Sequence, residues 1–290
     1  MRLAGDSELK LYGIFGYPLA HTVSPAMQNR AFDHYRLKSM YFAFERPPAR
    51  FRSLMRNIKS LLLDGFNVTV PYKEIVLRHL NQLSPEARAI GAVNTVKKVN
   101  GRWMGYNTDV YGFLAGLKEC RFSSRGRAAV ILGAGGSARA VSFALAKSGV
   151  RSICVANRTQ NRAQNLVRKF RAVFPGVRWM VARIGSKDLT KALSGADLIV
   201  NATKVGLKRS DGSLISRRSF PKRKVLVYDL IYRPRRTALL GLAQRLGHRV
   251  INGETMLLHQ GAKAFEIWTG RRAPLREMKQ AMHDALGARS

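Results

Sequence analysis

Residues 128–149 read AAVILGAGGSARAVSFALAKSG, and this stretch decides the fold. It opens with a continuous apolar run, which is typical of a strand buried on both faces of a parallel sheet. Gly133, Gly135 and Gly136 follow, and a helical pattern then runs to Gly149, a residue type that commonly ends helices. Glycines between a strand and a helix let backbone N–H groups approach a pyrophosphate. The stretch therefore predicts a dinucleotide-binding turn, and the alternative is a tight turn between closely packed elements.

The residues that follow keep the same alternation of strand and helix. Apolar runs at 151–159, 196–203 and 224–232 predict strands, and periodic patterns at 161–174 and 237–247 predict helices. Strands alternating with helices favour a parallel sheet that has helices on both faces. The sequence therefore predicts a doubly wound, Rossmann-type domain over residues 110–251.

The remainder of the chain predicts an N-terminal α/β domain, residues 1–109, completed by 252–290. Strands are expected at 10–18, 39–45 and 65–71, and helices at 49–62 and 84–91, the latter with Ser84 as N-cap. A further helix is expected over 24–36, with Ser24 as N-cap and Pro25 in its first turn. Residues 91–107 predict a hairpin that turns at Asn100–Gly101. Two long helices are expected after residue 252.

The composition is strongly basic, with 51 Lys and Arg against 17 Asp and Glu and a formal net charge of +34. Such a charge suits nucleic acid or another anionic surface. The basic residues are scattered, however, and no basic stripe with interleaved aromatic residues is present. We therefore expect a solvated basic surface that attracts anionic small molecules, and a nucleic-acid partner is disfavoured.

The chain predicts a cytoplasmic protein without a metal site. Its N-terminus lacks the apolar stretch of a signal peptide, and no run of about 18 apolar residues predicts a membrane span. Cys120 and Cys154 do not form a disulfide framework, which suits a reducing compartment.

The second predicted strand of the Rossmann-type domain indicates which dinucleotide is bound. Sites for NAD place an acidic residue about 20 positions after the glycine turn, where it accepts a hydrogen bond from the ribose 2′-OH. Here those positions hold Asn157, Arg158 and Thr159, with Arg162 one turn later. Guanidinium groups pair with a 2′-phosphate, so the sequence predicts NADP(H). The alternative is two solvated arginines in a basic protein.

A candidate anion site precedes the helix at 24–36. Thr22 and Ser24 can both direct hydroxyl groups toward a carboxylate near that helix N-terminus, where the partial positive charge favours an anion. The alternative is local capping, in which Ser24 bonds its own helix and Thr22 holds the turn. The sequence leaves both interpretations open.

A candidate proton-transfer group follows the strand in NVTVPYK, residues 67–73. Pro71 ends the strand because it has no N–H to donate, and Lys73 stands two residues later. Asp109 lies at the junction of the two predicted domains, where a ligand site is expected. A lysine paired with an aspartate can move a proton to and from an alcohol oxygen. The alternative is a surface salt bridge, and spacing alone does not bring the two residues together.

The first of the C-terminal helices carries one polar residue on an otherwise apolar face. Met256, Gln260 and Ala264 share that face because they are spaced four residues apart. A glutamine that faces inward needs a hydrogen-bond partner. Gln260 is therefore either a substrate ligand or a satisfied core amide.

Together these motifs resemble the shikimate dehydrogenase family over nearly the whole chain. The segments that carry the resemblance, in chain order, are GYPLAHTVSPAMQN, NVTVPYK, GAVNT, YNTD, GAGGSARA, NRT, NATKVGL, YDLIY and ETMLLHQGAKAFEIWTG. The resemblance implies NADP-linked interconversion of 3-dehydroshikimate and shikimate, a step of aromatic amino-acid biosynthesis. It also implies a substrate domain that faces the Rossmann-type domain across a cleft. Hydride would pass from NADPH to C3 of the substrate while Lys73 protonates the C3 oxygen.

The resemblance also assigns roles to individual residues. Lys73 and Asp109 match the catalytic pair. Thr22, Ser24 and Tyr232 match the residues that bind the substrate carboxylate. The ring hydroxyls are assigned to Thr69, Asn94, Asp109 and Gln260. The NADP-binding residues are Gly133, Ala134, Gly135, Gly136, Ser137, Ala138, Asn157, Arg158, Thr159, Arg162 and Leu230, with Gly253 and Met256 near the nicotinamide.

The chain departs from the family pattern in three respects. Thr22 replaces a commoner serine, and its methyl group can alter the choice between shikimate and quinate. Gln28 stands where histidine is frequent, and the charge is unusually basic. The alternatives are a quinate or broad-specificity dehydrogenase using NAD or NADP, and a non-catalytic nucleic-acid binder or regulator. The protein is expected to be a monomer or a homodimer.

Overall fold

The computed structural model describes residues 8–20, 22–208 and 210–288. The chain divides into two compact units, the first made of Met1–Thr108 and Leu258–Ser290 and the second of Asp109–Leu257. The sequence-based division into residues 1–109 with 252–290 and residues 110–251 stays a prediction. The second boundary falls inside helix α9 (Glu254–Thr269) rather than before it.

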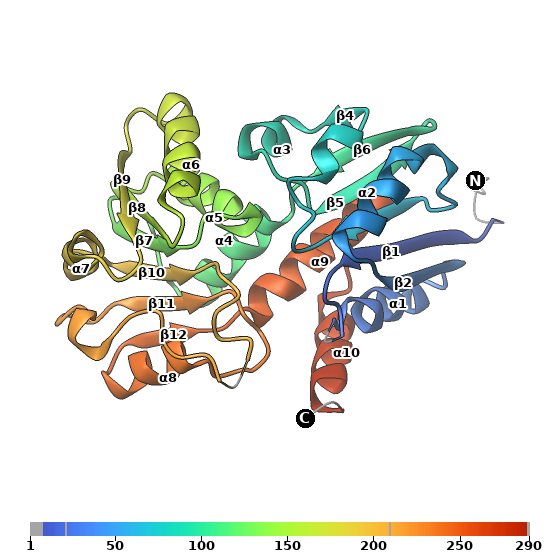
Figure 1. The fold of residues 1–290 in the computed structure, drawn as a ribbon. Coiled ribbons are helices and arrows are strands. Elements are labelled where there is room, and N and C mark those ends of the chain that lie inside the picture. Colours follow the sequence, from blue (N-terminus) through green and yellow to red (C-terminus); the bar gives the residue numbers. More distant parts are fainter. Residues whose placement is uncertain (1–7, 21, 209, 289–290) are drawn as a thin grey trace. The chain divides into compact units, whose positions relative to one another are not determined.

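The first unit is built on a six-stranded mixed sheet in the order β2-β1-β3-β5-β6-β4 (Figure 1). The strands are β1 (Lys10–Gly16), β2 (Ser39–Glu45), β3 (Gly65–Val68), β4 (Gln82–Leu83), β5 (Thr95–Val99) and β6 (Arg102–Tyr106). β1 pairs in parallel with β2 and β3, whereas β5 is antiparallel to both β3 and β6. Asn100 and Gly101 join β5 to β6 with positive φ angles of 48° and 73°, as the predicted two-residue hairpin requires.

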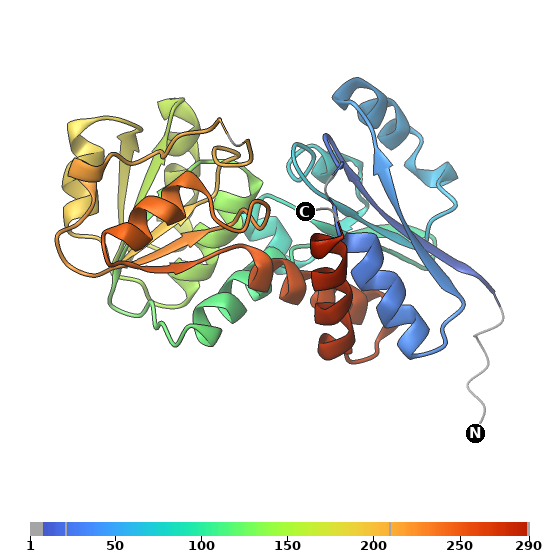
Figure 2. The ribbon, with the colours of Figure 1, turned by 90° about the horizontal axis from the view of Figure 1, so that it is seen from below.

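Helices cover both faces of this sheet. They are α1 (Ser24–His34), α2 (Pro48–Arg56), α3 (Pro85–Ile90), α10 (Leu275–Gly287) and most of α9, with short 3₁₀ turns at Ile58–Ser60 and Val76–His79. Alternation along β1 sends Tyr12 toward Phe32 of α1 and Trp268 of α9. Phe15 points to the other face and packs on Phe51 of α2. Figures 1 and 2 show α1 and α10 side by side.

The first residues of the helices show which predicted N-cap residues are correct. Ser84 caps α3, because its hydroxyl oxygen accepts from the N–H of Ala87 at 3.1 Å, so that prediction is confirmed. Ser24 is not an N-cap, because α1 already begins at Ser24, and among the described residues no side chain caps this helix. The Thr22 hydroxyl accepts instead from the N–H of Ser24 at 3.4 Å. The predicted helix at 49–62 ends at Arg56, where Asn57 leaves the helical conformation and a 3₁₀ turn follows.

The second unit is a six-stranded, fully parallel sheet in the order β12-β11-β10-β7-β8-β9. Its strands are β7 (Ala128–Leu132), β8 (Ser152–Asn157), β9 (Arg178–Arg183), β10 (Leu198–Asn201), β11 (Leu226–Asp229) and β12 (Arg249–Ile251). Its helices are α4 (Asp109–Glu119), α5 (Gly136–Lys147), α6 (Gln160–Val173), α7 (Lys187–Ser194) and α8 (Ala238–Arg245), with a 3₁₀ turn at Arg217–Ser219. This strand order is that of a Rossmann domain, which confirms the predicted fold class.

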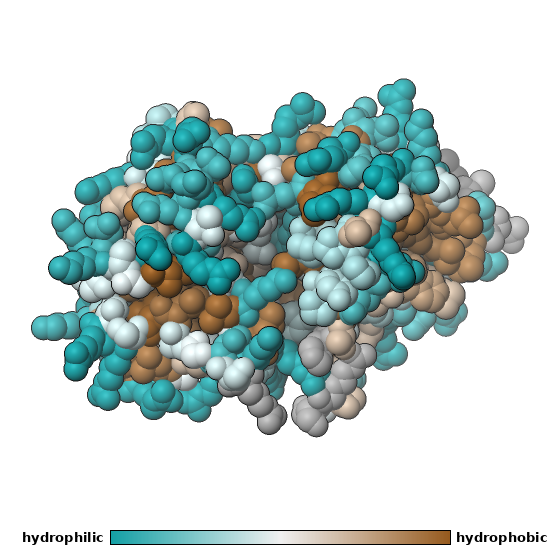
Figure 3. All heavy atoms as spheres, viewed as in Figure 1, coloured by the Kyte–Doolittle hydropathy of each residue, from teal (hydrophilic) through white to brown (hydrophobic). Residues whose placement is uncertain are grey.

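Hydrophilic side chains cover most of the face shown in Figure 3, as the basic composition predicts. A hydrophobic patch lies where Figure 1 places β1 and β2. Met40 and Phe42 of the edge strand β2 are exposed. Within the described ranges, no helix has the length and apolar character needed to cross a membrane. Nor does any group of three or more His, Cys, Asp or Glu side chains in these ranges form a candidate metal site.

His248, between α8 and β12, is a buried imidazole in an apolar setting. Its ring stacks on Phe220 with centroids 5.2 Å apart, and no described group hydrogen-bonds either ring nitrogen. Burial lowers the pKa of His248 because it disfavours the charged imidazolium. The native protein therefore holds this ring neutral at pH values where an unfolded chain would protonate it.

This difference predicts a loss of stability in mild acid. Between the unfolded-state pKa of about 6.5 and the lower folded-state pKa, the unfolded chain binds more protons than the native protein, so the free energy of unfolding falls as the pH decreases. His248→Phe, which keeps the aromatic stack, should flatten the pH dependence between about pH 7 and pH 5. Urea unfolding at a series of pH values measures the slope. An equal slope in both proteins would contradict the role of His248.

Candidate active site

A buried polar network lies at the centre of the first unit. Its members come from β2, β3, the start of β5, the segment after β6, and α9. They are Tyr41, Asn67, Asn94, Thr95, Thr108 and Gln260. The β3–β5 pairing places Asn67 opposite Thr95. Asn67 donates from Nδ2 to the Asn94 carbonyl at 2.9 Å and to Thr95 Oγ1 at 3.0 Å. Its Oδ1 accepts from the Tyr41 hydroxyl at 2.6 Å, so both ends of this amide are held.

The Asn94 side chain connects the network to two other parts of the chain. Its Oδ1 accepts from the Thr108 N–H at 2.8 Å, and its Nδ2 donates to Thr108 Oγ1 at 2.9 Å. Nδ2 also donates to Gln260 Oε1 of α9 at 3.2 Å. Asn94 and Gln260, assigned separately to the substrate ring, are therefore in contact. The bond to Asn94 fixes the orientation of the Gln260 amide.

Lys73 is held close to this network by its backbone. Its carbonyl accepts from the Val93 N–H at 2.8 Å, which places Lys73 beside the residue that precedes Asn94. The aromatic ring of Tyr72 anchors the same turn, because it is fully buried and stacks on Phe51 with centroids 3.9 Å apart. Thr69, at the start of the turn, donates its N–H to the Phe15 carbonyl at 2.9 Å. Lys73 and Thr69 thus follow a strand that a packed core fixes.

The predicted carboxylate ligands Thr22 and Ser24 lie in the same unit. Ser24 is buried at the first position of α1, and Thr22 is half-buried just before it. Gln28, one turn after Ser24, donates from Nε2 to the carbonyl of Gly261 at 2.9 Å. This bond ties α1 to α9 directly beside Gln260. The residue that departs from the family pattern therefore joins the two helices that carry predicted substrate ligands.

The glycine turn of the second unit follows β7, between β8 and β10. Gly133 has a φ of 112°, a conformation that favours glycine, and a Cβ at this position would lie 3.0 Å from the carbonyl oxygen of Ala202. Gly135 is the N-cap of α5, and the helix begins at Gly136. Ser137 and Ala138 lie in its first turn, so their N–H groups are among those that a helix N-terminus directs at an anion.

The loop that selects the nucleotide follows β8, the neighbour of β7. Asn157 ends the strand and donates from Nδ2 to the Thr159 carbonyl at 2.9 Å. Arg158 and Arg162 are exposed, and no acidic residue occurs in this loop. Because β7 and β8 are parallel, this loop and the glycine turn leave the same edge of the sheet. The residue types fit a 2′-phosphate.

The structure brings Leu230 and Gly253 together. The Gly253 N–H donates to the Ile231 carbonyl at 3.0 Å, and a Cβ on Gly253 would lie 2.1 Å from the Leu230 carbonyl oxygen. Only glycine fits at that distance. Met256 is buried in the first turn of α9, and Tyr232 follows the Leu230–Ile231 turn.

Two predicted groupings combine residues of different units. Lys73 belongs to the first unit, whereas Asp109 is the first residue of the second. Tyr232 likewise belongs to the second unit, and Thr22 and Ser24 to the first. These groupings stay predictions.

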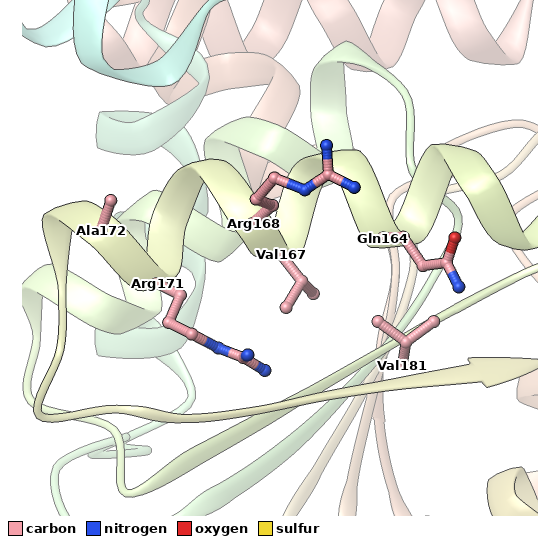
Figure 4. A pocket seen from close by; sticks show the side chains of 6 residues that line it. All are labelled: Gln164, Val167, Arg168, Arg171, Ala172 and Val181. Carbon is pink, nitrogen blue, oxygen red and sulfur yellow. The ribbon is translucent and has the colours of Figure 1, made fainter.

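A surface groove in the second unit is formed by other residues. Figure 4 shows the α6 and β9 side chains that line it, which are Gln164, Val167, Arg168, Arg171, Ala172 and Val181. Arg171 donates to the Trp179 carbonyl at 3.3 Å. No predicted site residue lines this groove.

Three protein-family models together match most of the chain. Residues 14–96 match the shikimate dehydrogenase substrate binding domain, residues 117–236 match the shikimate / quinate 5-dehydrogenase model, and residues 253–283 match the shikimate 5′-dehydrogenase C-terminal domain. The chain belongs to the shikimate dehydrogenase family. The resemblance inferred from the motifs is confirmed.

Individual members of the family are similar over nearly their whole length. The shikimate dehydrogenase (NADP(+)) of Symbiobacterium thermophilum is 42% identical over 96% of this chain and 95% of its own. That of Methanopyrus kandleri is 41% identical over 97% of both. The crystal structure of shikimate 5-dehydrogenase from Thermus thermophilus in complex with NADP(H) and shikimate has 38% identity and a TM-score of 0.83, covering 96% of this chain and 100% of that one.

Four members of the polar network, Tyr41, Asn67, Thr95 and Thr108, were not among the predicted site residues. Asn67, Thr95 and Thr108 are all buried and bond directly to Asn94 or to each other. Their sequence signal was a polar residue inside or next to an apolar strand, which requires a buried partner. In this family member they hold the predicted substrate ligands in place.

The bond between Tyr41 and Asn67 should make a measurable contribution to stability. Burial raises the pKa of the Tyr41 hydroxyl, which keeps it a donor. Tyr41→Phe would leave Asn67 Oδ1 buried without this donor and should lower the free energy of unfolding by about 1–3 kcal/mol. Urea denaturation measures the loss. Tyr35→Phe is the control, because the exposed Tyr35–Arg272 bond should contribute less than about 0.5 kcal/mol, and an equal effect of both variants would contradict the prediction.

Proposed function

We propose that this family member catalyses the NADP-linked, reversible reduction of 3-dehydroshikimate to shikimate. The observation that carries the proposal is the Asn94 side chain, which binds Gln260 and Thr108 in one network. Lys73 joins this network through Val93, and Asp109 directly follows Thr108 in the chain. Asn94 and Gln260 thus belong to this hydrogen-bond network, and Lys73 and Asp109 are each next to one of its residues, in contact or in sequence.

The residues of the first unit bind and orient the substrate in this proposal. Thr22 and Ser24 hold its carboxylate at the start of α1, assisted by Tyr232. Thr69, Asn94 and Gln260 bind the ring hydroxyls, and Asp109 binds the hydroxyl next to the reacting carbon. Since the network fixes Asn94 and Gln260 before substrate arrives, little conformational freedom is lost on binding.

Lys73 supplies the proton in this proposal. NADPH, when bound, supplies the hydride that reduces the C3 carbonyl. The oxygen of that carbonyl gains negative charge, and the Lys73 ammonium donates a proton or hydrogen bond to it. Asp109 orients the ammonium in this proposal. In the reverse direction, Lys73 receives the proton of the C3 hydroxyl.

The residues of the second unit fit the cofactor. Gly133, Ala134, Gly135, Gly136, Ser137 and Ala138 would hold the pyrophosphate. Asn157, Arg158, Thr159 and Arg162 would hold the adenine ribose and its 2′-phosphate, and Leu230, Gly253 and Met256 would lie near the nicotinamide. The proposed domains are a substrate domain of residues 1–109 and 252–290 and an NADP domain of residues 110–251.

A second candidate is a dehydrogenase that also accepts quinate, because Thr22 carries a methyl group at the proposed carboxylate site. The family model that matches residues 117–236 includes both activities in its description. Relative kcat/KM for shikimate and quinate with NADP and NAD decides between the two functions. The proposed function requires the larger value for shikimate with NADP.

We also place this enzyme in the cytoplasm as a monomer or a homodimer, acting on a small molecule in aromatic amino-acid biosynthesis. Free cysteines suit a reducing compartment. Burial raises the pKa of the Cys154 thiol to about 11, so this residue is an inert core group.

Lys73→Ala should lower kcat about 10²–10⁴-fold with little change in KM, because general acid assistance acts mainly in the transition state. Asp109→Asn should damage both parameters. Initial rates of shikimate oxidation, followed at the nicotinamide absorbance band, measure both. Lys98→Ala is the matched control, since Lys98 stacks over Trp103 in the same unit and has no proposed role in the reaction. A change confined to KM would make Lys73 a binding residue only.

Arg158→Ala should raise KM for NADP about tenfold to a hundredfold, because charge-assisted hydrogen bonds to the 2′-phosphate are lost. KM for NAD, which lacks that phosphate, should change little. The control is Arg168→Ala, a second arginine of the same region that lines the α6–β9 groove and has no proposed role in binding. A wild-type enzyme with no preference for NADP over NAD would contradict the phosphate assignment.

A further inference from the structure

Asp229, the last residue of β11, is a carboxylate that the proposed reaction does not use. Its side chain has no exposed surface. Oδ2 accepts from the Thr237 hydroxyl at 2.7 Å, and Oδ1 accepts from Asn201 Nδ2 at 3.0 Å and from the Ile231 N–H at 3.1 Å. A buried carboxylate is costly unless it is hydrogen-bonded, so these three donors compensate the burial of Asp229.

Each donor belongs to a different segment at the carboxyl edge of the sheet. Asn201 ends β10, Ile231 lies just beyond β11, and Thr237 is the N-cap of α8. The carboxyl edge of such a sheet is where dinucleotides bind. Asp229 therefore joins three segments at the place where the cofactor is proposed to lie.

The bond to Asn201 reaches the glycine turn. Asn201 Oδ1 accepts from the N–H of Thr203 at 3.0 Å and from its hydroxyl at 2.7 Å. These bonds set the loop after β10, whose Ala202 carbonyl and Thr203 methyl approach the Cβ position of Gly133 to 3.0 and 3.1 Å. A shift of this loop would therefore displace or crowd the first glycine of the turn.

The bond to the Ile231 N–H reaches the proposed nicotinamide side. It fixes the Leu230–Ile231 turn, whose Ile231 carbonyl accepts from Gly253 and whose Leu230 carbonyl leaves no space for a Cβ there. The Leu230 N–H in turn donates to the Asn201 carbonyl at 3.0 Å. Leu230 and Gly253 are both proposed cofactor residues, so the carboxylate sets the spacing between them.

We propose that Asp229 is a positioning residue for the cofactor: through Asn201 and Ile231 it holds the glycine turn and the Leu230–Gly253 pair in register. This inference rests on the proposed function, because it assumes that these segments bind NADP. Asp229 touches neither reactant in this role and acts only through its three donors.

The matched control is Asp197, a carboxylate at the opposite edge of the same sheet. It lies before β10, where its Oδ2 accepts from the Ala128 N–H at 2.8 Å and its Oδ1 accepts from Arg223 at 2.8 Å. Asp197 thus joins strands β7 and β10 at their amino ends, as Asp229 joins segments at the carboxyl ends. A purely structural role would make the two aspartates equivalent in a binding assay.

The experiment compares Asp229→Asn with Asp197→Asn in the full-length protein. Both should lower Tm, but only Asp229→Asn should raise the Kd for NADP, by about tenfold, because a misplaced turn loses hydrogen bonds to the pyrophosphate. Isothermal titration with NADP alone measures Kd without any need for turnover. KM for shikimate should stay within about twofold of wild type, since most of its proposed ligands lie in the first unit.

A second pair of variants decides the question if Asp229→Asn does not fold. Thr237→Val removes one donor to Asp229 and should raise the Kd for NADP, whereas Thr237→Ser keeps the hydroxyl and should restore it. Unchanged Kd in Asp229→Asn or, where that variant does not fold, in Thr237→Val would overturn the inference, as would an equal rise in Asp197→Asn. A wild-type protein that binds NADP but does not oxidise shikimate would contradict the proposed function, and the titration would still decide the role of Asp229.

Discussion

The first unit depends on the requirement that the buried Asn94 amide be fully hydrogen-bonded. A side-chain amide has two donors and an acceptor, and each one left without a partner in the interior costs about 1–3 kcal/mol. Thr108 and Thr95 satisfy the oxygen of Asn94, while Thr108 and Gln260 accept from its nitrogen. These partners lie on three separate segments, so satisfying one amide requires the hairpin, the end of β6 and α9 to assemble together. The same assembly produces the proposed substrate site.

The second unit differs from the first, because most of its proposed binding groups belong to the backbone. A parallel sheet with the order β9-β8-β7-β10-β11-β12 sends neighbouring connections in opposite directions at β7 and β10, which opens a space at the carboxyl edge. Gly133 packs closely against the Ala202 carbonyl and Thr203 beside that edge, and it can do so because it has no side chain. The proposed substrate site of the first unit is thus built from hydrogen-bonded side chains, whereas the proposed cofactor site of the second unit is built mostly from the backbone of a glycine turn.

The sequence predicted local features well and distant contacts poorly. Unbroken apolar runs located β7, β8, β10 and β11, and local turn chemistry located the Asn100–Gly101 hairpin and the Ser84 cap. β9 and α7 were not predicted. Arg178 and Arg183 leave only a short apolar run between them in β9, and Lys187, Asp188 and Lys191 interrupt the apolar pattern of α7. The assignment of Ser24 as N-cap was wrong, since the same residue types serve as caps and as first helical residues.

The site residues show the same division. The glycine turn and the arginines after β8 could be predicted because their function depends on a short segment and on residue type. The Asn94–Gln260 contact spans 166 positions, and no spacing rule reaches that far. Helical spacing singled out Gln260 as a possible ligand, whereas only the family resemblance named Asn94. The role of Asn67 was not predicted. A buried amide requires a hydrogen-bond partner, but the sequence does not identify that partner.

The arginine-lined groove beside β9 affects whether two copies of the protein can associate through this edge of the sheet. β9 is an edge strand, and the backbone of such a strand can recruit the edge of another molecule. Arg171 already occupies the Trp179 carbonyl, and exposed Arg178 and Arg183 stand at the two ends of the strand. Two such edges would bring like charges together, so this border of the sheet resists aggregation. Part of the basic surplus thereby acts as protection against self-association.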